Sequence, residues 1–171
     1  MIVDADGNLV VAGRTSSSNF PKTTALIGPG GGTDIFITRF NAAGNGLLGS
    51  AVIGGRNNDG VNIRSKYSGT TGQDGLRLNY GDDARSEVIL DNTGNIILAS
   101  CTQSQDFPVV APLQAAFAGG RQDGVILKFP PNLSAPLFST YFGGSGDDAC
   151  FVTSVHPLNG LIYVAGGTTS N

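Results

Sequence analysis

Paired acidic residues have the clearest potential for chemistry in this sequence. Asp82-Asp83 and Asp147-Asp148 recur at one place of an internal repeat, and Asn58-Asp59 takes that place once more. Stacked carboxylates of this kind can ring a channel and hold a cation. A short Asp side chain more commonly accepts hydrogen bonds from the amides of its own turn. We expect the second role, in which each Asp caps the turn that leads into a strand.

A second acidic motif, Asp4-Ala5-Asp6-Gly7, resembles half of a calcium loop. Calcium takes six to eight oxygen ligands, usually from several closely spaced carboxylates. The equivalent segment at 91–94 has lost one carboxylate, and the one at 157–160 has none. The motif therefore predicts a tight turn, and we expect no metal there.

The remaining chemistry-bearing residues are isolated. His156 is the only histidine and precedes Pro157 in an expected turn, so we interpret it as a surface residue. Cys101 and Cys150 lie at different places of the repeat, which favours two buried free thiols over a disulfide. The glycine-rich segment 28–32 lacks the Lys-Ser/Thr end of a phosphate loop. We expect no catalytic residue and no cofactor.

Composition narrows the class of protein further. The 171 residues carry a net charge of −3 with only 13% charged residues, whereas a nucleic-acid surface needs clustered Lys and Arg. Twenty-six glycines suit short strands joined by tight turns. No apolar run reaches the roughly 18 residues of a membrane span. Because Met1 leads straight into repeat sequence and Asn171 falls within a repeat, we expect a segment of a longer chain.

The elements that position these residues come from the repeat itself. Residues 3–15, 90–102 and 159–168 match one another, and residues 33–40 match 122–129. We expect four strands per repeat: a first at 84–90 and 149–155, a second at 8–13, 95–101 and 161–165, a third at 35–40 and 124–129, and a fourth at 47–53 and 136–142. A short helical turn is expected at Pro112–Ala118.

The second and third strands differ in pattern. The second is almost continuously apolar, which is typical of a strand buried on both faces. The third alternates, with Arg39 in one copy and Lys128 in the other set against the apolar side. We interpret these basic residues as lying on a wet face, in a strand near an edge of its sheet.

The motif Asp-x-x-Gly-Asn, followed by apolar residues, Thr and then Phe-Pro, occurs at 4–21 and 91–108. With the downstream Asp-x-apolar-apolar-x-Lys/Arg-Phe and Phe-Gly-Gly-x-x-Asp-Asp pieces, it resembles the bacterial β-propeller repeat known as the SBBP repeat. The resemblance implies an all-β fold of four-stranded antiparallel blades in large secreted or surface-attached proteins. It carries over no catalytic residues.

Two full units and a fraction form a partial ring of about two to three blades, fewer than the roughly four to eight of a closed propeller. One segment, at about 60–80, departs from the repeat as an inserted loop or hairpin. It carries basic and aromatic residues that suit contact with a glycan or a protein partner. The candidate partner-binding residues are Arg64, Lys66, Tyr67, Arg77 and Tyr80.

Three functions remain open from the sequence. We favour a non-enzymatic scaffold or binding module of a secreted or cell-surface bacterial protein, because side chains that recur in every unit usually serve the unit. The alternatives are part of a polysaccharide-active propeller enzyme, and an array that associates with itself through exposed blade faces. No nucleic acid and no membrane span are expected.

Overall fold

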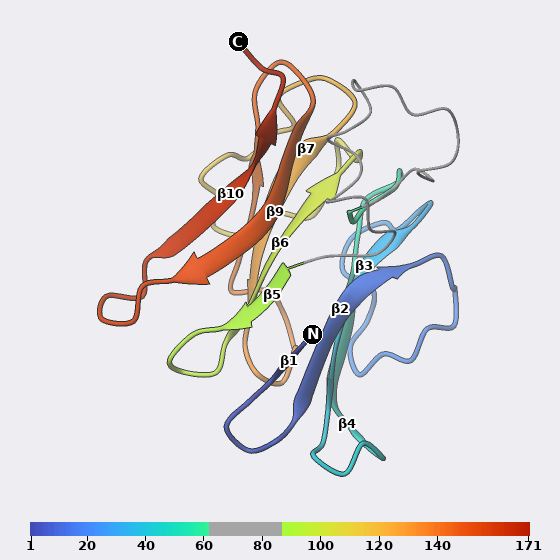
Figure 1. Cartoon of the computed structure of the whole chain (residues 1–171). Helices are drawn as coiled ribbons and strands as arrows, with labels where there is room; N and C mark the ends of the chain where they lie inside the picture. Colours follow the sequence, from blue (N-terminus) through green and yellow to red (C-terminus); the bar gives the residue numbers. More distant parts are fainter. Residues whose placement is uncertain (62–86) are drawn as a thin grey trace, which may run out of the picture.

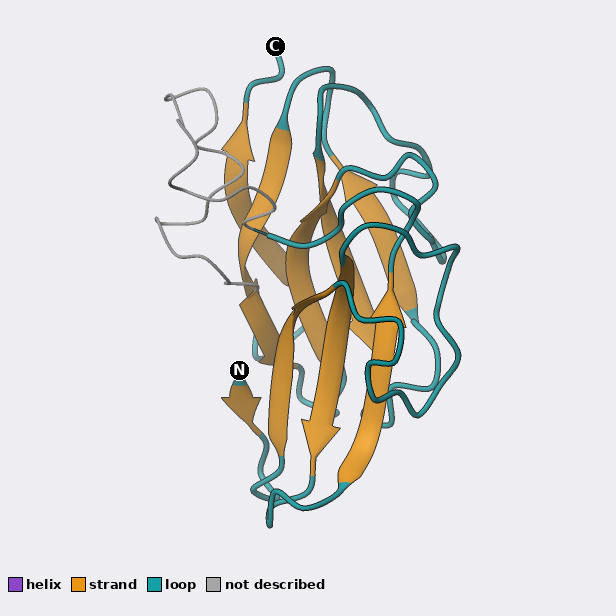
Figure 2. Cartoon of the chain, turned by 90° about the vertical axis from the view of Figure 1, so that its right-hand side faces the viewer, coloured by secondary structure: helices purple, strands orange, loops and turns teal. Residues whose placement is uncertain are grey.

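The computed structural model describes residues 1–61 and 87–171, and both parts are all-β. Figure 2 shows strands joined by loops, and within these residues there is no helix. The helical turn expected at Pro112–Ala118 is wrong, because this segment runs as an irregular loop. None of the described residues form a helix of the length and apolarity that a membrane span requires.

The strands form three antiparallel sheets that stand side by side, with the second between the other two (Figure 1). Within each sheet, strands that follow one another in the chain are hydrogen-bonded neighbours. Sheet I contains β1 (Ile2–Val3), β2 (Leu9–Thr15), β3 (Asp34–Phe40) and β4 (Leu47–Ile53). Sheet II contains β5 (Glu87–Leu90), β6 (Ile96–Thr102), β7 (Asp123–Phe129) and β8 (Phe138–Phe142), and sheet III contains β9 (Asp148–Val155) and β10 (Ile162–Thr168).

These strands confirm the expected positions within the described residues. Register also repeats, because Thr15 lies opposite Asp34 in sheet I just as Thr102 lies opposite Asp123 in sheet II. The strand expected at 84–90 is described only from Glu87.

The core shows how the sheets stack. We call the side of a sheet that carries Ile37 or its equivalent Ile126 the front face, and the side that carries Thr38 or its equivalent Leu127 the back face. One apolar cluster joins the front face of sheet I to the back face of sheet II. It contains Val10, Ile35, Ile37, Ala51 and Ile53 from the first and Ile96, Leu98, Val125, Leu127 and Phe129 from the second.

The same arrangement recurs one sheet further on. Ala99 and Ile126 of the front face of sheet II pack with Cys150 and Val164 of sheet III. Sheet II is therefore covered on both faces, and all seven residues of β6 are buried. The expectation of a second strand buried on both faces is confirmed for β6, whereas β2 and β10 each belong to a sheet with one covered face and remain partly exposed.

The expectation that the basic residues of the third strand lie on a wet face near a sheet edge is wrong. Arg39 shares the front face with Ile35 and Ile37, which are fully buried, and β3 is an interior strand of its sheet. Arg39 forms an ion pair with Asp4 of the preceding turn, and Lys128 forms the equivalent pair with Asp91 at 2.8 Å. Alternation alone could not show that a neighbouring sheet covers this face.

The turns before the second strands confirm the role expected for their first Asp. Asp91 Oδ1 accepts hydrogen bonds from the amides of Thr93 and Asn95, both at 2.9 Å, and Asp4 accepts from Asp6 and Asn8 in the same way. Burial acts to raise the pKa of Asp4, but hydrogen bonds from Arg39 and Asn8 outweigh it and hold the pKa at about 2. These carboxylates are therefore ionised at neutral pH.

Replacing Asp91 with alanine should lower the free energy of unfolding by about 2 kcal/mol, because the turn amides lose their acceptor and Lys128 loses its counter-ion. Chemical denaturation monitored by circular dichroism measures this loss. The matched control is Asp6→Ala on an exposed residue of the first turn, which should change stability by less than about 0.5 kcal/mol. Equal effects of the two substitutions would contradict the assigned role of Asp91.

Candidate functional site

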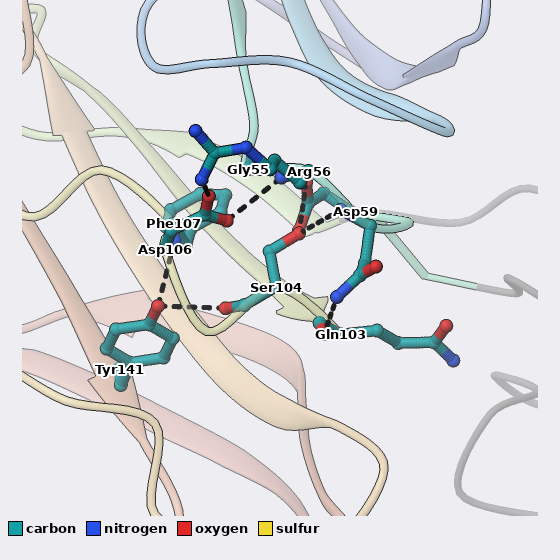
Figure 3. Close-up of polar contacts among 9 residues, drawn as sticks. Gly55, Arg56, Asp59, Gln103, Ser104, Asp106, Phe107 and Tyr141 are labelled. Carbon is teal, nitrogen blue, oxygen red and sulfur yellow. Dashed lines mark hydrogen bonds and ion pairs between the residues drawn. The ribbon is translucent and has the colours of Figure 1, made fainter.

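The junction between sheets I and II holds a group of buried polar side chains with the contacts around them, shown in Figure 3. A turn after β4 brings Gly55 to Asp59 against the loop that follows β6. Asp59 is fully buried, and its carboxylate accepts hydrogen bonds from the Gly55 amide at 2.8 Å, the Ser104 hydroxyl at 3.1 Å and the Thr102 hydroxyl. The carboxylate of Asp59, in the segment that follows β4, thus anchors the end of β6 in sheet II.

Tyr141 of β8, in sheet II, also contacts the junction. Its hydroxyl donates to the Ser104 carbonyl and accepts from the Phe107 amide, at 2.8 and 2.9 Å. Burial raises the pKa of Tyr141 to about 12, so the hydroxyl keeps its proton. The ring of Phe107 is buried against that of Tyr141.

The rim of the junction is more exposed. Arg56 forms an ion pair with Asp106 at 2.6 Å, and the Asn57 side chain donates to the Gln103 carbonyl at 3.0 Å. Exposed pairs of this kind stabilise a fold by no more than about 1 kcal/mol. The buried carboxylate of Asp59 is therefore the dominant polar group of the junction.

A second carboxyl group faces Asp59. A Cβ atom added to Gly54 would collide with Asp34 Oδ1 and lie 2.8 Å from Asp59 Oδ2, so both oxygens border the same small space. Asp34 Oδ1 is buried and has no hydrogen-bond donor among the described residues. Burial is the main cause that raises the pKa of Asp59 to about 7, and the charge of Asp34 adds to it.

The junction between sheets II and III repeats this pair. A Cβ on Gly143 would lie 2.7 Å from Asp123 Oδ1 and 2.9 Å from Asp148 Oδ2. Asp148 accepts from the Gly144 amide and the Ser170 hydroxyl, at 2.7 and 2.8 Å, as Asp59 does from Gly55 and Ser104. Burial, with a smaller contribution from Asp148, raises the pKa of Asp123 to about 6. The expectation that each Asp of this pair caps its own turn is thereby confirmed for Asp148, whereas Asp147 accepts a hydrogen bond from the Arg121 amide of another loop.

Paired carboxyls with raised pKa values also occur at the active sites of glycoside hydrolases, where one carboxyl donates a proton to the substrate. Here Asp59 and Asp123 are both 0% exposed, so a substrate has no access to them. Calcium needs more oxygen ligands than one such pair supplies. Across residues 1–61 and 87–171, no group of three His, Cys, Asp or Glu side chains is placed to hold a metal. In each junction one carboxyl oxygen, Asp34 Oδ1 or Asp123 Oδ1, is buried without a hydrogen-bond donor among the described residues.

The other residues singled out from the sequence lie apart from these junctions. His156 is in the turn between β9 and β10, where its ring lies 6.4 Å from that of Tyr163. Cys101 and Cys150 are buried free thiols, as expected, and burial raises the pKa of both. Asp82-Asp83 and the candidate partner-binding residues Arg64, Lys66, Tyr67, Arg77 and Tyr80 lie outside the described residues.

Hydroxyl-bearing residues at the ends of the second strands also recur in the sequence. Thr102-Gln103-Ser104 recurs as Thr168-Thr169-Ser170 and as Thr15-Ser16-Ser17, at the end of each second strand. These hydroxyl pairs recur in step with the Asp at the start of each first strand, and in two junctions a serine bonds that Asp. Co-recurrence of a carboxylate and hydroxyls would have predicted their contact.

No model of a known protein family matches the chain, and a search of curated proteins likewise finds no match.

Substitution of Gly143 by alanine should destabilise the fold by about 2 kcal/mol, because the new methyl group would be forced between two buried carboxyls. Thermal or urea unfolding checks the loss. Gly44→Ala, at a φ of 71° with open space around its Cα, gives the size of a loss from backbone strain without a clash, whereas Gly143 lies outside the positive-φ range and would lose stability through the clash. A loss at Gly143 no greater than the loss at Gly44 would contradict the carboxyl pair.

Proposed function

We propose that the chain is a non-enzymatic β-propeller-type scaffold or binding module, in which each sheet is one blade and successive blades stack around a common axis. The observation that carries the proposal is the repeated packing of the front face of one sheet on the back face of the next. Stacking of this kind adds units without a change of geometry, as propellers do.

The hydrogen bonds of the acidic residues support a structural role. Asp4 and Asp91 hold turns, Asp59 holds the end of β6, and Asp148 holds the segment that follows β10. These recurrent acidic groups are thus engaged within the architecture. We further propose, from the resemblance of the repeat, that the chain belongs to a secreted or cell-surface bacterial protein and that its partner is a glycan or a protein.

A panel of polysaccharides tests the proposal against the enzyme alternative. We expect the chain to release no reducing ends from any polysaccharide of the panel. A polysaccharide that is a binding partner should instead be retained on a surface that carries the immobilised chain. Turnover that disappears in an Asp59→Asn variant with unchanged stability would overturn the non-enzymatic assignment. The molar mass in solution, measured over a range of concentrations, distinguishes the self-associating alternative.

A further inference from the structure

The two cysteines of the chain belong to neighbouring sheets and meet at the junction between sheets II and III. Cys101 is in β6, where it lies opposite Gly124 on the front face of sheet II. Cys150 is in β9 and packs on that face with Ala99 and Ile126. β9 lies beside β6 (Figure 1), so the different places of the two cysteines in the repeat are what brings them together.

The surroundings of Gly124 place the two thiols on one small patch. A Cβ atom added to Gly124 would lie 2.5 Å from Cys150 Sγ and 3.0 Å from the Cys150 amide nitrogen. Cys150 therefore sits directly over the strand neighbour of Cys101. Cys101 in turn packs with Ala149, the residue before Cys150. Both side chains are buried in this contact between two sheets.

The electrostatic surroundings of the thiols agree with this proximity. Burial is the main cause that raises the pKa of Cys101, the charge of Cys150 adds to it, and a hydrogen bond from the Cys150 amide acts in the opposite direction. Burial likewise raises the pKa of Cys150 to about 12. Because the thiolate is the form that attacks a disulfide, both groups react slowly in the folded chain at neutral pH. Their oxidation belongs to the folding chain, before sheet III covers sheet II.

We propose that Cys101 and Cys150 form a cross-linking site, at which a disulfide covalently joins sheet II to sheet III. The co-reactant is a small-molecule disulfide such as oxidised glutathione. One cysteine thiolate attacks a sulfur of this molecule and releases its first thiol, and the other cysteine then attacks the mixed disulfide and releases the second. The two cysteines are oxidised, and the small disulfide is reduced to two thiols that take up the two protons.

A bond at this place opposes the separation of two neighbouring units. It closes a loop of about 50 residues, and the constraint on the unfolded chain should lower the equilibrium constant of unfolding about 1,000-fold. Burial also shields the finished bond from reductants. Sheet I has Arg14 at the place of Cys101, so the link is particular to the junction between sheets II and III.

The test refolds the whole chain from urea in a mixture of reduced and oxidised glutathione. We expect neither cysteine to be alkylated when the product is denatured afterwards, and digestion to yield a linked peptide pair that contains Cys101 and Cys150. Urea unfolding of this product and of the same chain reduced with a phosphine should differ about 1,000-fold in the equilibrium constant. This mapping on the parent chain requires no variant to fold.

Cys101→Ala and Cys150→Ala are the matched controls. Neither variant can form the link, so refolding with oxidised glutathione should not raise the urea midpoint of either one. Two cysteines that are still alkylated after refolding would show a buried pair that only fills space, and would overturn the proposal. A disulfide between two chains, or an oxidised chain no more stable than the reduced one, would overturn it as well.

Discussion

Replacing Asp59 with alanine is expected to lower the free energy of unfolding, measured at pH 4–5, by about 4 kcal/mol, a large share of the stability of a domain of this size. The substitution leaves the Gly55 amide and the hydroxyls of Thr102 and Ser104 without their acceptor in a buried junction. Each unsatisfied buried donor costs about 1–3 kcal/mol. The loss should appear in urea denaturation followed by far-ultraviolet circular dichroism.

The matched control is Asp106→Ala in the same junction. The side chain of Asp106 is 34% exposed and pairs with the more exposed Arg56, so its removal should cost no more than about 1 kcal/mol. If the two variants lose equal stability, the buried carboxylate does not tie the sheets together.

The second large effect is on the pH dependence of stability. Burial raises the pKa of Asp59 to about 7, above its ordinary value of 3.8, so between these pH values the folded chain holds a proton that the unfolded chain has released. Stability is then fully present near pH 4 and is lost as the pH rises to 7, by about 4 kcal/mol from this group alone. Asp123, with its pKa raised to about 6, acts in the same direction.

At acidic pH, below about 4, stability changes with pH in the opposite direction. Burial acts to raise the pKa of both Asp4 and Asp91. Hydrogen bonds from Arg39 and Asn8 nevertheless hold the pKa of Asp4 at about 2, and hydrogen bonds from Lys128 and Asn95 likewise lower the pKa of Asp91. Their contribution is present above pH 4 and is lost as the pH falls towards 2. We therefore expect maximal stability at about pH 4–5, measured as the urea midpoint across a pH series.

Asp34→Asn separates the carboxyl pair from other causes of this profile. In the parent chain, Asp34 Oδ1 is buried and has no hydrogen-bond donor among the described residues. The side-chain amide introduced by the substitution carries its own hydrogen atoms at this position. The substitution also removes the charge that helps to raise the pKa of Asp59. The variant should be more stable than the parent at pH 8 by about 2 kcal/mol, and its profile should be flatter. A parent chain that gains stability steadily from pH 4 to pH 8 would contradict the raised pKa values.

Much of this structure could be predicted from the recurrence of residue types. The second strands are recognisable from runs such as Ile96–Ala99, and the tight turns from Asp91 and Gly94, because strand length and positive φ depend on nearby residues. The environment of Arg39 could not be predicted in this way. Alternation separates the two faces of a strand, but which face has a neighbouring sheet depends on the assembly of the units.

The carboxyl pairs illustrate the same limit. Asp34 and Asp59 belong to different halves of the repeat, and their approach depends on how the turn at Gly54 and Gly55 folds over β3. Asp34 and Asp123 occupy the same position of the repeat, but this recurrence does not indicate what the position does. Only the folded turn brings these side chains together.

The central claim is that successive units stack with the front face of one sheet on the back face of the next. Methyl-to-methyl nuclear Overhauser effects test it most directly. We predict cross-peaks between the Ile35 and Ile37 methyls of sheet I and the Val125 and Leu127 methyls of sheet II, which belong to one buried cluster. Cross-peaks that instead join Ile37 to Ile126, its equivalent on the front face of sheet II, would contradict the stacking.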